Sequence, residues 1–215
     1  MSSFPLILSA PSGGGKTTIG RELLRRRSDL GYSVSCTTRA PRPGERDGTD
    51  YYFLTRDEFI AARERGEFAE SAVVHDDLYG TLRSEVDKVL GSGRHVVMDI
   101  DVQGARQFID VYPESVLVFV LPPDSTVLLE RLKARGTEDS KGFDRRLRSA
   151  VAEFGAVPMY HYIVVNEQLD RAVDDVSKIL DAEQMRTSRV DRLDERIAEL
   201  VAGLESATGN NQRSN

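Results

Sequence analysis

The chain has 215 residues, of which 40% are hydrophobic, and a formal net charge of −6 at pH 7. This length allows one domain, with or without insertions, and a sizeable core. The negative charge argues against broad nucleic-acid binding, so we expect no nucleic-acid partner. No apolar stretch approaches the roughly 18 residues that a membrane-spanning helix needs. We therefore expect no membrane partner and a cytoplasmic location.

Cysteine and histidine usage excludes further classes. Cys36 is the only cysteine, which rules out an internal disulfide and fits a reducing compartment. The histidines, at positions 75, 95 and 161, are widely separated, so we expect no dedicated zinc site. Arginines gather in two places despite the acidic balance, which favours small phosphorylated ligands over a polyanion. The two clusters are Arg39, Arg42 and Arg46, and Arg131, Arg135, Arg145, Arg146 and Arg148.

The N-terminal segment has the pattern of a phosphate-binding loop between a strand and a helix. The apolar run 4–8 predicts the strand, and Ile19, Leu23 and Leu24 predict the helix. Glycines between them allow successive amides to point at one anion, and the start of the helix adds a positive field. We predict that this loop binds the phosphates of a nucleotide, and the loop alone leaves ATPases, GTPases and kinases open. Its residues are Ala10, Pro11, Ser12, Gly13, Gly14, Gly15, Lys16, Thr17 and Thr18.

Two side chains of this loop have a chemical role in the pattern. Lys16 would reach the β- and γ-phosphates and is a predicted catalytic residue. The Thr17 hydroxyl would ligate Mg²⁺, which we expect as the cofactor that accompanies ATP. Ala10 stands where the usual pattern has its first glycine, and we expect it to keep a negative φ.

Three further apolar runs predict buried strands that alternate with helical patterns, at 95–100, 116–121 and 162–165. Strands buried on both faces and separated by helices indicate an α/β fold with a parallel, doubly wound sheet. The stretch 32–90 breaks this alternation, and we interpret it as a small subdomain inserted between core segments 1–31 and 91–205. Residues 134–149 are charged and lack a strand pattern, and we predict a mobile lid between two helices.

The C-terminal part has a helical pattern from 170 to 205. Its apolar residues are spaced by three and four, at Val190, Leu193, Ile197, Leu200 and Leu204. Two accounts fit this spacing: a terminal helix packed on its own core, or a coiled coil between two copies. The oligomeric state therefore stays open between monomer and homodimer. We expect one domain over 1–205 and a disordered tail over 206–215.

A second motif narrows the function. Residues 35–53, SCTTRAPRPGERDGTDYYF, resemble the monophosphate-binding motif of guanylate kinases, which transfer a phosphoryl group from ATP to GMP. The resemblance covers roughly residues 4–185, in consistent order. It implies a P-loop fold with an inserted α+β subdomain for the nucleoside monophosphate, a helical lid, and ATP and GMP as small-molecule substrates. The matching segments are Glu70, 79–81, 99–104, 131–138 and 164–166.

The resemblance implies a phosphate clamp for GMP. Arg39 and Arg42 can offer two planar guanidiniums to one phosphate, and Glu45 can hold an arginine in position. Tyr51 and Tyr79 can donate phenolic hydrogen bonds to the same phosphate. Asp99 ends an apolar strand, where a parallel sheet places its ligand crevice. Its role stays open between supporting the metal site and orienting the acceptor phosphate.

The resemblance also implies how guanine would be selected. Guanine has N1–H and 2-amino donors that adenine lacks. The matching carboxylates, Glu70 and Asp101, can accept these donors, while the hydroxyls of Ser35 and Thr81 can donate to O6. With AMP bound, these groups would be unpaired, which can enforce a preference for GMP over AMP of about 10⁴- to 10⁵-fold.

Further matching residues belong to the ATP side. Arg135 and Arg146 match catalytic lid arginines that neutralise the transferring phosphoryl group. Asn166 matches a position close to the adenine ring. Arg131 is a further candidate, either for the phosphates or for a position near adenine.

Two other classes share this fold. Guanylate-kinase-like scaffold modules bind phosphopeptides and characteristically lose the phosphate loop, whereas residues 15–17 retain Gly-Lys-Thr here. A transferase for a phosphorylated sugar would not need the complete guanine set. One local departure concerns residues 75–78, His-Asp-Asp-Leu, where the family more often has a Gly-Asn pair. We expect a different local turn there.

Overall fold

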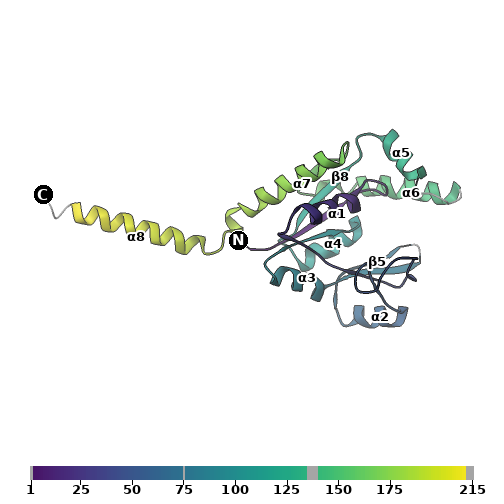
Figure 1. Cartoon of the computed structure of the whole chain (residues 1–215), viewed down its shortest axis with the longest axis horizontal. Coiled ribbons are helices and arrows are strands. Elements are labelled where there is room, and N and C mark those ends of the chain that lie inside the picture. Colours follow the sequence, from purple (N-terminus) through teal and green to yellow (C-terminus); the bar gives the residue numbers. More distant parts are fainter. Residues whose placement is uncertain (1, 75, 135–139, 212–215) are drawn as a thin grey trace. The chain divides into compact units, whose positions relative to one another are not determined.

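The computed structural model describes residues 2–74, 76–134 and 140–211. The chain divides into two compact units, one of residues 3–179 and one of residues 1–2 with 180–215. Both sheets lie in the larger unit (Figure 1). The described helices all fall short of the length and apolar character that a bilayer span requires.

The larger unit is built on a five-stranded parallel sheet in the order β2-β7-β1-β8-β9. The predicted α/β class is therefore confirmed, and so are the strands predicted after residue 90, the first of them one residue shorter. The strands are β1 (Pro5–Ser9), β2 (Leu30–Tyr32), β7 (His95–Asp99), β8 (Val116–Leu121) and β9 (Tyr162–Val165). The connecting helices are α1 (Lys16–Arg26), α3 (Arg83–Gly91), α4 (Val102–Val111), α5 (Ser125–Ala134), α6 (Ser140–Phe154) and α7 (Leu169–Gln184), with a 3₁₀ turn, η1, at Val157–Met159.

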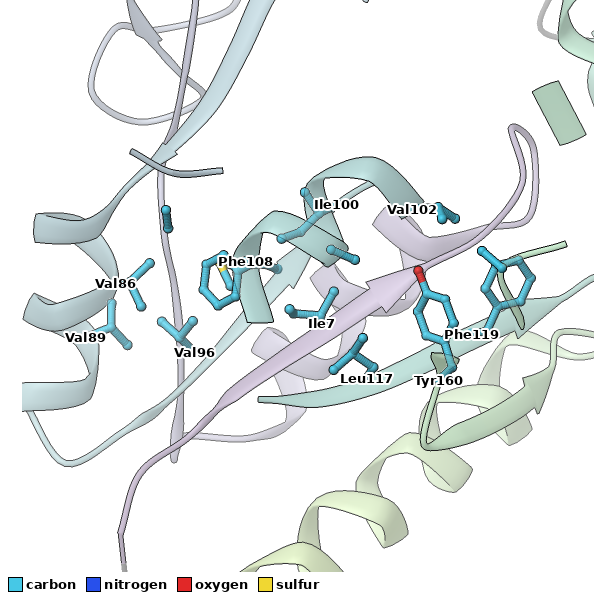
Figure 2. Close-up of a cluster of buried hydrophobic side chains, with 14 residues drawn as sticks. Ile7, Val86, Val89, Val96, Ile100, Val102, Phe108, Leu117, Phe119 and Tyr160 are labelled. Carbon is cyan, nitrogen blue, oxygen red and sulfur yellow. The ribbon is translucent and has the colours of Figure 1, made fainter. Parts of the chain in front are cut away.

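Side-chain alternation along the strands gives this sheet two apolar faces. Figure 2 shows one of them, where the buried cluster runs from Val86 and Val89 of α3 through Ile7 of β1 to Phe119 and Tyr160. On the other face Leu8 packs against α1, because its Cδ1 lies 3.8 Å from where a Cβ on Gly20 would be. Helices thus cover both faces, as a doubly wound sheet requires.

The inserted subdomain has its own sheet in the order β4-β3-β6-β5 and its own small core around Cys36, Phe59 and Phe68. Its antiparallel pairs are β3 with β6 and β6 with β5. A capping box at Thr55 and Glu58 begins its helix. The elements are β3 (Ser35–Thr37), β4 (Tyr52–Phe53), α2 (Arg56–Glu64), β5 (Phe68–Val74) and β6 (Asp77–Leu82).

The insertion ends earlier than the predicted boundary at residue 90. Helix α3 buries Val86 and Val89 in the core cluster of the parallel sheet, beside Val96. Apolar packing therefore assigns α3 to the core, and the inserted sheet ends with Leu82.

The sequence departure at residues 75–78 falls where β5 leads into β6. Asp76 has a φ of 71°. Aspartate tolerates this left-handed conformation better than most residues with a side chain, so it can stand where the family more often uses Gly-Asn. His75 lies outside the described residues.

The predicted lid is more helical than its charge pattern suggested. Residues 140–149 belong to α6, in agreement with the helical lid that the resemblance implies, and residues 135–139 lie outside the described residues. α5 and α6 share a cluster in which Leu128 and Leu132 meet Ala150, and Phe143 and Leu147 pack against it. These apolar residues, spaced along α6, explain why the charged stretch is helical.

The smaller unit contains the end of α7, a 3₁₀ turn, η2 (Thr187–Arg189), and α8 (Leu193–Asn211). The helical pattern predicted from 170 to 205 is broken at residues 185–192. There the chain turns, Arg192 has a φ of 54°, and buried Arg189 pairs with buried Glu183 at 3.3 Å. α8 continues to Asn211, beyond the predicted helical limit at Glu205.

The close approach of β2 to α3 gives a test of the core packing. A Cβ on Gly31 would lie 2.4 Å from Cγ1 of Val89, whereas a Cβ on Gly91 would meet nothing within 4 Å. We expect Gly31→Ala to lower the free energy of unfolding by about 1 to 3 kcal/mol through overpacking. Urea unfolding measures this change, with Gly91→Ala as the control. Equal stability of the two variants would contradict this packing.

Candidate functional site

The phosphate loop joins the end of β1 to the start of α1. Gly13 and Gly15 have φ values of 82° and 97°, a conformation that residues with a side chain rarely adopt. The Gly15 carbonyl accepts the first bond of the helix from the Ile19 amide at 3.0 Å. The amides that start α1 have no earlier helical turn to donate to, so they and Lys16 are suited to meet an anion.

Ala10 is accommodated because residue 14 is a glycine. Ala10 is not among the described residues with a positive φ, in agreement with the sequence expectation. A Cβ on Gly14 would lie 2.7 Å from the Ala10 Cβ and 2.9 Å from the Pro11 carbonyl oxygen. The Ala10 methyl therefore fills the space that a side chain at position 14 would need. The Gly14 amide donates to the Pro11 carbonyl at 2.8 Å, which closes the loop.

Asn166 and Arg131 reach the loop from distant parts of the sequence. Asn166 follows β9 directly and is 6% exposed. Its side-chain amide donates to the Gly14 carbonyl at 2.9 Å. Arg131 of α5 donates to the Asn166 carbonyl at 3.2 Å. Both predicted ATP-side residues thus lie against the loop.

Thr17 and Asp99 connect the loop to the neighbouring strand. The Thr17 hydroxyl donates to the Asp99 carboxylate at 2.5 Å. Asp99 ends β7 and lies beside Leu8 of β1 in the parallel ladder. The Thr17 and Asp99 side chains therefore meet at the carboxyl edge of the sheet. Hydroxyl and carboxylate oxygens are the protein ligands that Mg²⁺ prefers.

A cavity of about 490 Å³ extends from α1 to the inserted subdomain. It collects Thr17 of the loop and six of the ten residues predicted to bind GMP. These six are Arg39, Arg42, Glu45, Tyr51, Tyr79 and Asp99. The cavity therefore joins the predicted metal ligand to the predicted phosphate clamp.

Arg39 is the most constrained side chain of the clamp. It donates to both carboxylate oxygens of Glu45, at 2.9 and 3.0 Å, and to the Tyr79 hydroxyl at 3.2 Å. Its guanidinium also lies 5.6 Å from the centre of the Tyr51 ring. Hydrogen bonds from the Arg42 amide and from Arg39 hold the pKa of Glu45 below its ordinary value. The clamp is thus arranged by protein contacts alone.

Three residues predicted to recognise guanine form one row across the inserted sheet. Thr81 of β6 is the register partner of Ser35 on β3 and of Glu70 on β5. Register partners present their side chains on the same face of a sheet. The Thr81 hydroxyl donates to the Glu70 carboxylate at 2.7 Å. This row does not line the cavity of the phosphate clamp.

Glu70 is buried where the inserted subdomain meets α4. A Cβ on Gly104 would lie 2.7 Å from Oε2 of Glu70 and 2.7 Å from Cγ2 of Ile100, so the glycine lets Glu70 approach α4 closely. Asp101 caps α4 by accepting from the Gly104 amide at 2.7 Å. Burial, and secondly the nearby Asp101 carboxylate, raise the pKa of Glu70 to about 7, against the opposing hydrogen bond from Thr81. The fourth predicted guanine ligand, Asp101, thus lies near the row.

Of the two predicted lid arginines, the structure describes only Arg146. Arg146 donates to the Leu132 carbonyl at 3.4 Å, which links α6 to α5. Arg135 lies outside the described residues.

The cavity also contains residues that the sequence interpretation did not single out: Arg21, Tyr32 and Asp50. Tyr32 ends β2 and pairs in register with Val97 of β7. Its position at the carboxyl end of a strand was the signal available in the sequence. The sequence interpretation also did not single out Glu153, whose carboxylate interacts with Lys16 of the phosphate loop. Glu153 lies on α6, two helical turns after Arg146. Burial raises its pKa, while Lys16 and the Ser12 amide oppose that rise.

A strand–loop–helix with Gly-Lys-Thr, a parallel sheet and an inserted acceptor subdomain define a P-loop nucleoside monophosphate kinase. The family model described as guanylate kinase matches residues 2–183. The chain belongs to the guanylate kinase family, whose reaction is the ATP-dependent phosphorylation of GMP to GDP.

Similar proteins agree with this assignment. The guanylate kinase of Thermotoga maritima is 46% identical over 183 residues, covering 85% of this chain and 88% of its own. That of Nitrosomonas europaea is 43% identical over 183 residues, covering 85% and 91%. The crystal structure of guanylate kinase from Anaplasma phagocytophilum has a TM-score of 0.74 at 35% identity, covering 90% of this chain and 93% of its own.

The burial of Glu70 predicts a pH-dependent stability. Its pKa rises from 4.5 in the unfolded chain to about 7 in the folded chain, so its favourable contribution is complete below pH 4.5 and is lost as the pH rises through 7. Relative to Glu70→Gln, we expect the wild type to lose about 3 kcal/mol of unfolding free energy across this window. Urea unfolding at several pH values measures the difference. The exposed control Glu64→Gln should run parallel to the wild type, and a parallel Glu70→Gln curve would contradict the burial.

Proposed function

We propose that the cavity between α1 and the inserted subdomain is the place where this chain transfers the γ-phosphoryl group of ATP to GMP. The observation that carries the proposal is the cavity lining itself. Thr17 of the phosphate loop and the Arg39–Glu45–Tyr79 clamp face the same space. A phosphoryl transferase needs this juxtaposition, because the donor and acceptor phosphates must meet in line.

In this proposal ATP binds with its phosphates on the loop formed by residues 10–18. The amides at the start of α1 and the Lys16 ammonium neutralise the β- and γ-phosphates. Asn166 and Arg131 support this side through the loop contacts described above.

GMP binds in the inserted subdomain in two parts. Its phosphate lies in the clamp, where Arg39 and Arg42 supply charge and Tyr51 and Tyr79 supply hydroxyl donors. Burial raises the pKa of Tyr51, so that phenol keeps the proton that it would donate. The guanine reaches the row of Ser35, Thr81 and Glu70, with Asp101 beside it.

The transfer needs positioning and charge neutralisation more than covalent assistance. A phosphate oxygen of GMP forms a bond to the γ-phosphorus, and the bond from that phosphorus to the bridging oxygen of ADP breaks. Lys16 stabilises the charge that develops on the equatorial oxygens. Arg146 and Arg135 are the lid residues assigned to the same task, which requires closure of the lid and exclusion of water.

Mg²⁺ is the cofactor that the family implies. The Thr17 hydroxyl would hold it, and the Asp99 carboxylate would orient that hydroxyl or a bound water. Among the described residues, no group of three or more His, Cys, Asp or Glu side chains could hold a metal ion. This fits an ion whose other ligands are substrate phosphates and water. When bound, it would supply neutralisation of the β- and γ-phosphates.

The most informative assay measures ADP formation from MgATP with GMP, AMP, UMP or CMP as acceptor. We expect ADP release that depends on GMP and is lost in a folded Lys16→Ala variant. ADP release at the same rate without an acceptor would indicate an ATPase and would contradict the proposal.

Replacement of the buried carboxylate tests guanine selection. Glu70→Ala removes the acceptor for the guanine donors, so we expect the KM for GMP to rise by about 10-fold or more. The exclusion of AMP should relax, measured as the ratio of kcat/KM for GMP and AMP. The exposed Glu64→Ala is the control. An unchanged ratio in Glu70→Ala would mean that another group selects the base.

A further inference from the structure

The amide side chain of Asn166 is directed at the phosphate loop and is almost completely buried. Its Nδ2 donates to the Gly14 carbonyl at 2.9 Å, and the residue is 6% exposed. The backbone fixes the position of Asn166, because its backbone N–H donates to the Leu121 carbonyl at 2.8 Å and extends the β8–β9 ladder. The donor is thus held by the sheet while its target belongs to the loop.

This hydrogen bond orients one peptide plane. The carbonyl of residue 14 and the amide of residue 15 belong to the same planar trans peptide and point in opposite directions. Because the Gly14 carbonyl accepts from Asn166, the Gly15 N–H points away from Asn166. In the proposed function the ATP phosphates would lie on that side of the loop. A rotation of this plane would withdraw that amide from an anion.

The contact leaves no room for variation at position 15. A Cβ on Gly15 would lie only 2.2 Å from Nδ2 of Asn166, and Gly15 has a φ of 97°. The glycine therefore serves two purposes: it permits the left-handed conformation, and it allows the amide of Asn166 to approach the backbone. Arg131 adds support, because its Nη2 donates to the Asn166 carbonyl at 3.2 Å and its Cβ would lie 3.3 Å from a Cβ on Gly13.

We infer that Asn166 is a positioning residue that acts on phosphate binding through the Gly14–Gly15 peptide. This inference rests on the proposed binding of ATP phosphates at the loop. It differs from a contact with the adenine ring, because it makes Asn166 matter for ligands that contain phosphate and no base.

Magnesium pyrophosphate separates the two roles, because it has phosphates and no base. We expect Asn166→Ala to weaken binding of magnesium pyrophosphate about 5- to 30-fold, the effect of losing one hydrogen bond to a buried carbonyl. MgADP should weaken by a similar factor. Isothermal titration calorimetry measures both affinities. Asn166→Asp has nearly the same shape but no donor, and it should weaken both ligands at least as much.

Two controls keep a positioning role apart from general damage. Gln168→Ala removes an exposed side-chain amide two residues further on and should leave both affinities unchanged. GMP affinity should stay within about twofold of the wild type in every variant, since the clamp does not contact Asn166.

Three results would overturn the inference. If Asn166→Ala weakens MgADP binding but not pyrophosphate binding, Asn166 contacts adenine, and if it weakens pyrophosphate and GMP binding in parallel, the variant has a structural defect. The third result is that the wild type does not bind magnesium pyrophosphate. Failure of the proposed function itself would show separately, as a wild type that forms no ADP in response to GMP.

Discussion

The hydrogen bond between Thr17 and Asp99 links the phosphate loop to the end of β7, at the edge of the cavity. Thr17 belongs to the first turn of α1, which follows β1, and Asp99 ends β7, 82 positions further along the chain. β1 and β7 are neighbours in the parallel sheet. The carboxyl edge of such a sheet is where successive loops converge. Both residues line the cavity that the clamp of the inserted subdomain also lines, and the proposed transfer depends on donor phosphates reaching this cavity.

Charge is distributed so that two anions can meet. On the donor side the amides and Lys16 are positive, while on the acceptor side Arg39 is held by Glu45, Tyr79 and the ring of Tyr51. Because Glu45 already fixes Arg39, the guanidinium loses little freedom when a phosphate arrives. The row proposed to bind guanine has the opposite arrangement, because Glu70 is a buried acceptor whose desolvation is offset only in part by the hydrogen bond from Thr81. In the proposed site adenine would leave this acceptor without its donors, which disfavours AMP.

Much of this could be predicted from the sequence. The parallel sheet followed from apolar runs, the loop from its glycines and Gly-Lys-Thr, and the predicted clamp from the resemblance of residues 35–53 and 79–81 to guanylate kinases. Features that depend on long-range packing could not. The contact of Asn166 with Gly14 joins residues 152 positions apart, and the assignment of α3 to the core depends on Val86 and Val89 meeting β7.

The position of bound guanine tests the central claim most directly. A crystal structure with GMP and MgADP should show the purine against Glu70 and Asp101, with its phosphate on Arg39 and Tyr79 and the diphosphate of ADP on the loop. A purine bound elsewhere, or a GMP phosphate outside the cavity that Thr17 and Asp99 line, would contradict the account.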